Sequence, residues 1–125
     1  MSQKLIVFYN NDSQIEFDRT KEPSASQVVY LNRMDEKMRQ GVEIHGEFFT
    51  NPDALQRARF VAMELIRAIL NEEEAMAAAT CTYLAYRIPD LKAVKAFESD
   101  GGGINIELAF DQDYTKQVKV HFDLQ

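Results

Sequence analysis

The sequence predicts a single α+β domain over residues 1–125, with about three helices packed against a mostly antiparallel sheet in the order ββαβααβββ. Three observations predict this class: a hairpin pattern opens the chain, helical periodicity fills its middle, and alternating strand patterns around a glycine run close it. The length of 125 residues is typical of one domain, and a hydrophobic content of 46% provides for a sizeable core.

The first strand pattern covers residues 4–10, where apolar side chains occupy both faces. This predicts a central strand that is covered on both sides. The cluster Asn10-Asn11-Asp12-Ser13 predicts a turn. Residues 14–19 then alternate apolar and acidic side chains, so they return as a half-exposed strand and complete an N-terminal β-hairpin.

The first helix is predicted to begin at Ser24, because Ser24 and Gln27 have the spacing of a capping box. Gly41 is predicted to end it. Asp35 and Arg39 lie one turn apart and are expected to pair on the outer face. The inner stripe is expected to comprise Val28, Leu31, Met34 and Met38.

A second helix is predicted over residues 53–70, where apolar positions cover about half of the helical circumference. Two residues break this pattern, because Arg59 falls inside the apolar sector and Phe60 falls outside it. Asn71 is expected to cap a third helix, with the acidic run of residues 72–74 in its first turn.

The end of the chain is predicted to form three adjacent antiparallel strands, a C-terminal β-meander. Residues 91–98 give the first strand, and Gly101-Gly102-Gly103 gives the turn that follows. Residues 104–110 and 118–124 alternate apolar and polar side chains, as half-buried strands do.

Two patterns in this region have the spacing of catalytic motifs. Gly101-Gly102-Gly103 has the composition of a phosphate-binding loop, but no helix pattern follows it. Asp111-Gln112-Asp113-Tyr114-Thr115 has the order of a phosphatase nucleophile motif, but only ten residues follow it, too few for the other groups that this chemistry needs. Both are therefore interpreted as hairpin turns.

Four residues form a candidate metal site. Glu43, His45 and Glu47 alternate along residues 42–49, which are predicted to form one strand, and therefore share a face. If this strand neighbours the strand that carries His121, two imidazoles and several carboxylates meet, a donor set that suits zinc or a non-haem metal. The alternative is a solvated strand face without a ligand.

Arg59, with His45 and His121, is a candidate ligand-binding group, because a buried guanidinium can hold an anion through two hydrogen bonds. The alternative is an Arg59 side chain that extends to solvent or pairs with a nearby carboxylate. Cys81 lies in an alanine-rich helical segment, where cysteine is typically a small buried apolar residue rather than a nucleophile. No catalytic residue and no cofactor is predicted.

The charge balance restricts the partners that the sequence predicts. The formal net charge is −6, and the basic residues are scattered, which argues against nucleic acid and anionic membranes. A single cysteine excludes an intramolecular disulfide and fits a reducing compartment, so a cytoplasmic location is expected. No segment has the apolar length of a membrane span.

The leading functional hypothesis from the sequence is a non-enzymatic protein-interaction or regulatory domain, expected to form a homodimer because amphipathic strands have edges that need cover. One alternative is a small-molecule or metal-binding protein, which could include an enzyme, with a cleft between helices and sheet. Another is an acidic inhibitor or immunity-type protein that meets a basic partner through residues 72–74.

Overall fold

The computed structural model describes residues 4–44, 46–110 and 117–123, the last of these as backbone only. Their elements follow one another as β1 (Lys4–Tyr9), β2 (Asp12–Asp18), α1 (Ala25–Arg39), β3 (Val42–Ile44), β4 (Glu47–Phe49), α2 (Ala54–Leu70), α3 (Glu74–Arg87), β5 (Ala93–Glu98), β6 (Gly103–Ala109) and β7 (Gln117–Asp123). The predicted α+β class is confirmed.

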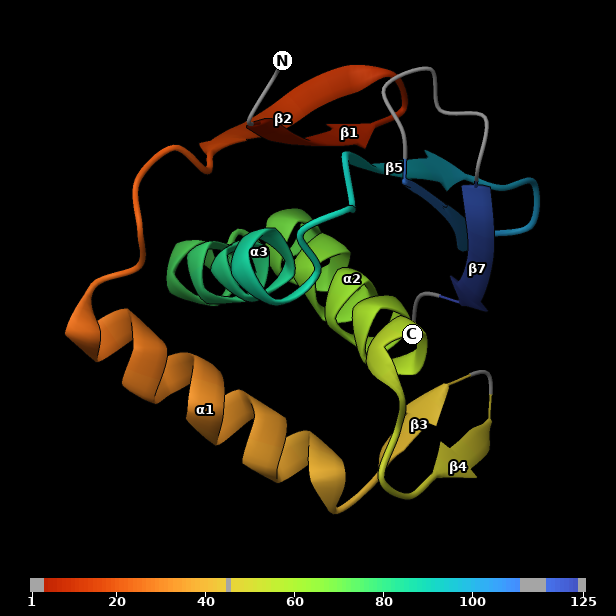
Figure 1. Cartoon of the computed structure of the whole chain (residues 1–125). Helices are drawn as coiled ribbons and strands as arrows, with labels where there is room; N and C mark the ends of the chain where they lie inside the picture. The colour runs from red at the N-terminus through yellow and green to blue at the C-terminus, as the bar shows by residue number, and fades with distance from the viewer. Residues whose placement is uncertain (1–3, 45, 111–116, 124–125) are drawn as a thin grey trace.

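The main sheet has the strand order β2-β1-β5-β6-β7 and curves over α2 and α3 (Figure 1). The N-terminal hairpin β1–β2 and the C-terminal meander β5–β6–β7 are both antiparallel, as predicted. β1 and β5 pair in parallel and join these two units into one sheet. A parallel pair needs a crossover connection, and the segment that contains all three helices provides it.

The tight turn between β1 and β2 consists of Asn10 and Asn11, which both have positive φ angles of 49° and 71°. Asparagine tolerates this left-handed conformation better than most residues, and two such residues in succession are typical of a type I′ hairpin turn. The strand β2 therefore starts at Asp12, earlier than the alternating pattern indicates.

The hydrophobic core lies between one face of the sheet and the helices α2 and α3. Leu5 and Val7 of β1 point into it and are fully buried, whereas Ile6 and Phe8 on the opposite face are only half-buried. The prediction that β1 is covered on both sides is therefore wrong, because the helices cover a single face. The largest fully buried side chains are Tyr83, Leu5, Leu31, Leu65, Ile66, Leu84, Leu91, Ile104, Ile106 and Leu108.

The helix α1 crosses below α2 and α3 and stands apart from the sheet (Figure 1). The predicted capping box of Ser24 and Gln27 is present. Leu31 and Met38 of the predicted inner stripe are buried and Met34 is half-buried, but Val28 is exposed. The first turn of α1 therefore does not pack into the core.

Two local predictions are corrected around α2. Residues 42–49 form a small separate hairpin, β3–β4, instead of one strand, because Gly46 takes a positive φ of 77° and reverses the chain. Asn71 caps the C-terminus of α2, not the N-terminus of α3, since Glu72 adopts a positive φ of 58° and interrupts the helical path. Across the described residues, every helix is too short or too polar to cross a membrane.

Candidate functional site

The two glutamates of the predicted metal site, Glu43 and Glu47, do not lie on one strand. Glu43 lies on β3 and Glu47 on β4, and these two strands pair with each other and not with the main sheet. His45 lies outside the described residues, and His121 is described only as backbone, in β7 opposite Asn105. Among the residues that the structure describes, no three potential ligands lie close enough to hold a metal ion.

Arg59 is half-buried on α2. Its Nε atom is buried and has no hydrogen-bond partner within the described part of the chain. The Nε atom of Arg59 is thus withdrawn from solvent, as a position in the apolar sector of α2 indicates.

Cys81 is a buried free thiol on α3. Burial raises its pKa to about 12, although the positive charge of Arg19 acts in the opposite direction. The thiol is therefore protonated at neutral pH, and the thiolate that nucleophilic chemistry needs is strongly disfavoured.

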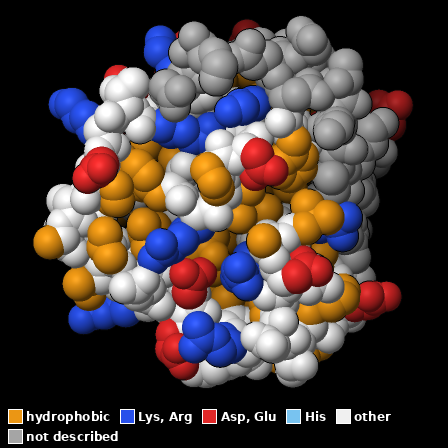
Figure 2. Space-filling model, viewed as in Figure 1, with side chains coloured by type: hydrophobic (Ala, Val, Ile, Leu, Met, Phe, Trp, Pro, Cys, Tyr) orange, Lys and Arg blue, Asp and Glu red, His pale blue; other side chains and the backbone are white. Residues whose placement is uncertain are grey.

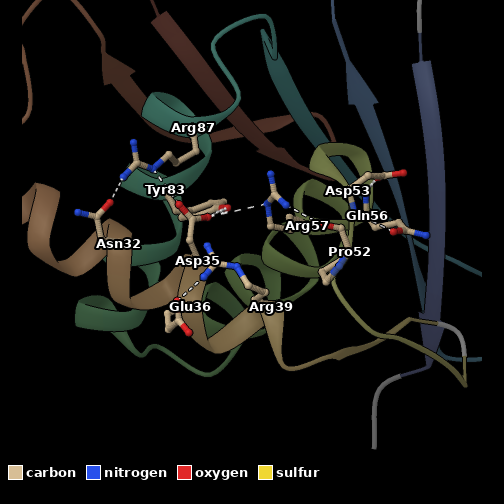
Figure 3. A network of polar contacts seen from close by, with 10 residues as sticks. All are labelled: Asn32, Asp35, Glu36, Arg39, Pro52, Asp53, Gln56, Arg57, Tyr83 and Arg87. Carbon is tan, nitrogen blue, oxygen red and sulfur yellow. Dashed lines mark hydrogen bonds and ion pairs between the residues drawn. The ribbon is translucent and has the colours of Figure 1, made fainter.

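A polar network fixes α1 to the other two helices, and Asp35 is its centre (Figure 3). The Tyr83 hydroxyl of α3 donates a hydrogen bond to Asp35 Oδ1. Arg87 Nε lies 3.2 Å from Asp35 Oδ2, and Arg57 Nε of α2 lies 3.9 Å from Asp35 Oδ1. The Asp35 carboxylate thus contacts side chains from both α2 and α3.

The two arginines of this network also donate hydrogen bonds to groups other than Asp35. Arg87 Nη2 donates to the side chain of Asn32 at 2.5 Å, and Arg57 Nη1 donates to the Pro52 carbonyl at 2.6 Å. Basic and acidic side chains alternate across the gap between α1 and the other helices, with hydrophobic side chains around them (Figure 2). The network therefore joins α1 to both α2 and α3.

The predicted pair of Asp35 and Arg39 does not form. Arg39 instead pairs with Glu36, three residues earlier on the same helix. The sequence spacing of Asp35 and Arg39 is suitable for a local pair, but Tyr83, Arg57 and Arg87 compete for the same carboxylate from other helices. No sequence signal links these groups, because they are far apart along the chain.

The opposite flank of α1 borders an apolar groove of about 360 Å³. At 100° per residue, positions 30, 33, 34 and 37 lie on the side of α1 away from Asn32, Asp35 and Arg39. Its apolar lining, here called the floor, includes methionine and aromatic side chains from all three helices, and the polar residues of the lining are here called its border. The groove is lined by Tyr30, Arg33, Met34, Lys37, Met38, Gly41, Val42, Phe60, Glu64, Met76 and Thr80.

Phe60, which the sequence pattern places outside the buried stripe of α2, lines this groove. Its position is explained by α1, which covers a second face of α2. At the end of the groove, the ring of Phe48 lies against Gly41, where a Cβ atom would come within 2.1 Å of the ring. Gly41 also has a φ of 136°, so both the left-handed backbone and the close contact require glycine.

A second and larger cavity, of about 770 Å³, lies between β2, the end of α2 and the start of α3. Ile15, Phe17 and Cys81 belong to its apolar wall. The acidic run of residues 72–74 lies at its border, with exposed side chains. Of these carboxylates, Glu74 lies in the first turn of α3 and Glu73 at its N-cap position, and all three border the cavity.

Comparisons with protein families, with curated proteins and with solved structures find no match to this chain. The class of protein is therefore defined by the geometry alone: an α+β domain in which a polar network holds an outer helix over an open, methionine-rich groove.

Proposed function

We propose that this chain is a non-enzymatic protein-interaction domain that receives apolar side chains of a partner in the groove between α1, α2 and α3. The observation that carries the proposal is the lining of this groove, in which Met34, Met38 and Met76 lie with Phe60 and Tyr30 around one open volume. Methionine is flexible and polarisable, so a surface built from it can adapt to a partner's side chains.

Exposed apolar side chains around the groove support the same proposal. Tyr30 and Met76, which line the groove, are 38% and 43% exposed. Single exposed apolar residues are ordinary, but exposed apolar residues that gather at one groove are typical of an interaction surface. The net charge of −6 makes nucleic acid and anionic membranes unfavourable partners, and the buried free thiol of Cys81 suits a cytoplasmic protein.

Site-specific photocrosslinking in cells tests the proposal. A benzophenone amino acid replaces Met76 or Tyr30 at the groove, and the matched control replaces Asp100 in the exposed turn before β6. We expect a crosslinked protein from positions 76 and 30 and none from position 100. Equal crosslinking from all three positions, or none from the groove, would contradict a specific partner at this surface.

Self-association is a second proposal, and the edge strand β2 supports it. β2 is at one end of the sheet order, and most of its side chains are exposed. A free edge can pair with the same edge of another copy. Sedimentation velocity at micromolar concentration tests this, and a monomer that persists at the highest concentration would refute self-association without affecting the groove.

A further inference from the structure

Two basic side chains stand at the border of the groove. Arg33 and Lys37 both line it from α1, and they lie four residues apart and therefore on the same side of the helix. Within the described part of the chain, neither side chain has a hydrogen-bond or ion-pair partner. They contrast with Arg39, Arg57 and Arg87, which all bind a carboxylate.

The acidic groups near the groove do not neutralise these two cations. Glu64 lines the groove from α2, but Arg67 holds it through a hydrogen bond of 2.9 Å. The charge at the border is thus locally positive, although the whole chain has a net charge of −6. A local charge opposite to that of the whole molecule favours an acidic partner at this site.

The size and shape of the groove favour side chains over a whole ligand. A volume of about 360 Å³ is at the low end for small-molecule sites. Three helices form the lining, and an amphipathic helix commonly places anchors at i, i+3 or i+4 and i+7 into such a groove. Acidic residues beside those anchors would then meet Arg33 and Lys37.

Building on the proposed function, we propose that the occupant is an acidic amphipathic helix of another protein, with apolar anchors on the groove floor and carboxylates against Arg33 and Lys37. A second copy of the chain fits less well. A groove that received a different surface of the next copy would give an open-ended assembly.

Selection from a phage-displayed library of random peptides, each long enough for about four helical turns, tests this occupant. The baits are the wild-type chain, the double variant R33E/K37E, and the control K21E/K92E, which changes the net charge equally but leaves the groove intact. Circular dichroism and thermal unfolding verify that each bait is folded.

We expect the wild type to enrich acidic peptides with apolar residues at helical spacing. Their fluorescence-anisotropy affinities should fall about tenfold or more in R33E/K37E and remain nearly unchanged in K21E/K92E. Met76→Glu, which changes the floor, should abolish binding of the same peptides. Selection on R33E/K37E should enrich basic peptides instead.

Four results would overturn the proposal. Enrichment of neutral or basic peptides by the wild type would refute the acidic occupant, and an equal loss in K21E/K92E would show that general charge, not the groove, determines binding. Self-association that R33E/K37E abolishes would identify a second copy as the occupant. Photocrosslinks at positions 76 and 30 without any enrichment from the library would support the proposed interaction surface. The same result would refute the proposal that an acidic helix occupies it.

Discussion

The helices α1 and α2 have similar lengths, 15 and 17 residues, and both begin with a capping box, but they are held in place by different forces. α2 buries seven side chains in the core, whereas α1 buries Leu31 and Met38. α1 depends in addition on the contacts of Asp35 with Tyr83, Arg57 and Arg87. Apolar burial stabilises α2 and does not depend on precise geometry. Polar contacts, which do depend on it, hold one flank of α1, and the other flank is left open at the groove.

This difference predicts unequal local stability. Elements with few buried apolar contacts open with lower free energies than core strands and helices. α1 should therefore open before the sheet and α2 do. A surface that binds a partner benefits from this arrangement, because small movements of α1 can widen the groove without unfolding the core.

The largest effect is expected for Leu65→Ala in α2. Leu65 is fully buried, so the lost contacts and the resulting cavity should lower the free energy of unfolding by about 2–5 kcal/mol. The matched control is Leu55→Ala in the same helix, where the side chain is 38% exposed and the loss should be about 1 kcal/mol or less. Urea denaturation monitored by circular dichroism measures both.

Leu31→Ala makes the same deletion at a buried position of α1. We expect a loss near the lower end of the range, about 2 kcal/mol, because α1 can move to fill part of the cavity. A loss at Leu31 as large as that at Leu65 would contradict the distinction between the two helices.

Asp35→Asn should have the next largest effect. It keeps the size of the side chain but removes the charge that faces two arginines, and it should cost about 1–3 kcal/mol. In hydrogen exchange, the amides of α1 should lose protection while those of β5 and β6 keep it. Glu36→Gln is the control, because Glu36 pairs with Arg39 on the exposed face of α1, and its loss should be about 0–1 kcal/mol. Lost protection in β5 and β6 equal to that in α1 would show that the network supports the whole core.

Much of the fold could be predicted because its signals are local. The capping box of Ser24 and Gln27 and the turn at Gly101 and Gly102 depend on residues that are close in sequence, and the structure contains both. Gly101 and Gly102 take the positive φ angles that favour glycine, and the Ser99 amide donates to the Gly103 carbonyl at 2.8 Å across the turn.

The errors arise where tertiary contacts or a single backbone angle decide the outcome. Gly46 converts one predicted strand into a hairpin, and with it the common face of Glu43 and Glu47 disappears. Asp35 pairs with residues that are far from it in the sequence, and the rules for residue spacing along a helix do not predict such pairs. The groove could not be predicted for the same reason, because its lining comes from three helices. In the sequence, only the position of Phe60 outside the apolar stripe indicated that a second face of α2 is covered.

The Asp-Gln-Asp motif of residues 111–113 lies outside the described residues, so its interpretation as a turn remains a prediction.

The acidic run of residues 72–74 illustrates a different limit. Its composition is typical of a helix N-terminus, and α3 does begin at Glu74, but the residue that caps it could not be read from the sequence. Glu73 occupies the N-cap position without a side-chain hydrogen bond.

The smallest predicted effect concerns alkaline pH, and it distinguishes the core from the α1 contact. Burial raises the pKa of Cys81 from 9.0 to about 12, and burial followed by the hydrogen bond to Asp35 raises the pKa of Tyr83 above its ordinary 10.0. Each folded-state group holds its proton more tightly than the unfolded one, so its stabilisation is complete below the ordinary pKa and is lost as the pH rises toward the folded-state value.

The free energy of unfolding should therefore fall above pH 9.0, by up to about 1 kcal/mol per pH unit for each group. Cys81→Ala should remove the part that begins near pH 9.0, and Tyr83→Phe the part that begins near pH 10.0. Tyr30→Phe is the control, because Tyr30 is an exposed tyrosine outside the network. Cys81 reports on the core, whereas Tyr83 reports both on its burial and on its contact with Asp35 of α1. A chain that shows the first decline and lacks the second would have its core intact and α1 undocked, and the polar network would then be wrong as the force that holds α1.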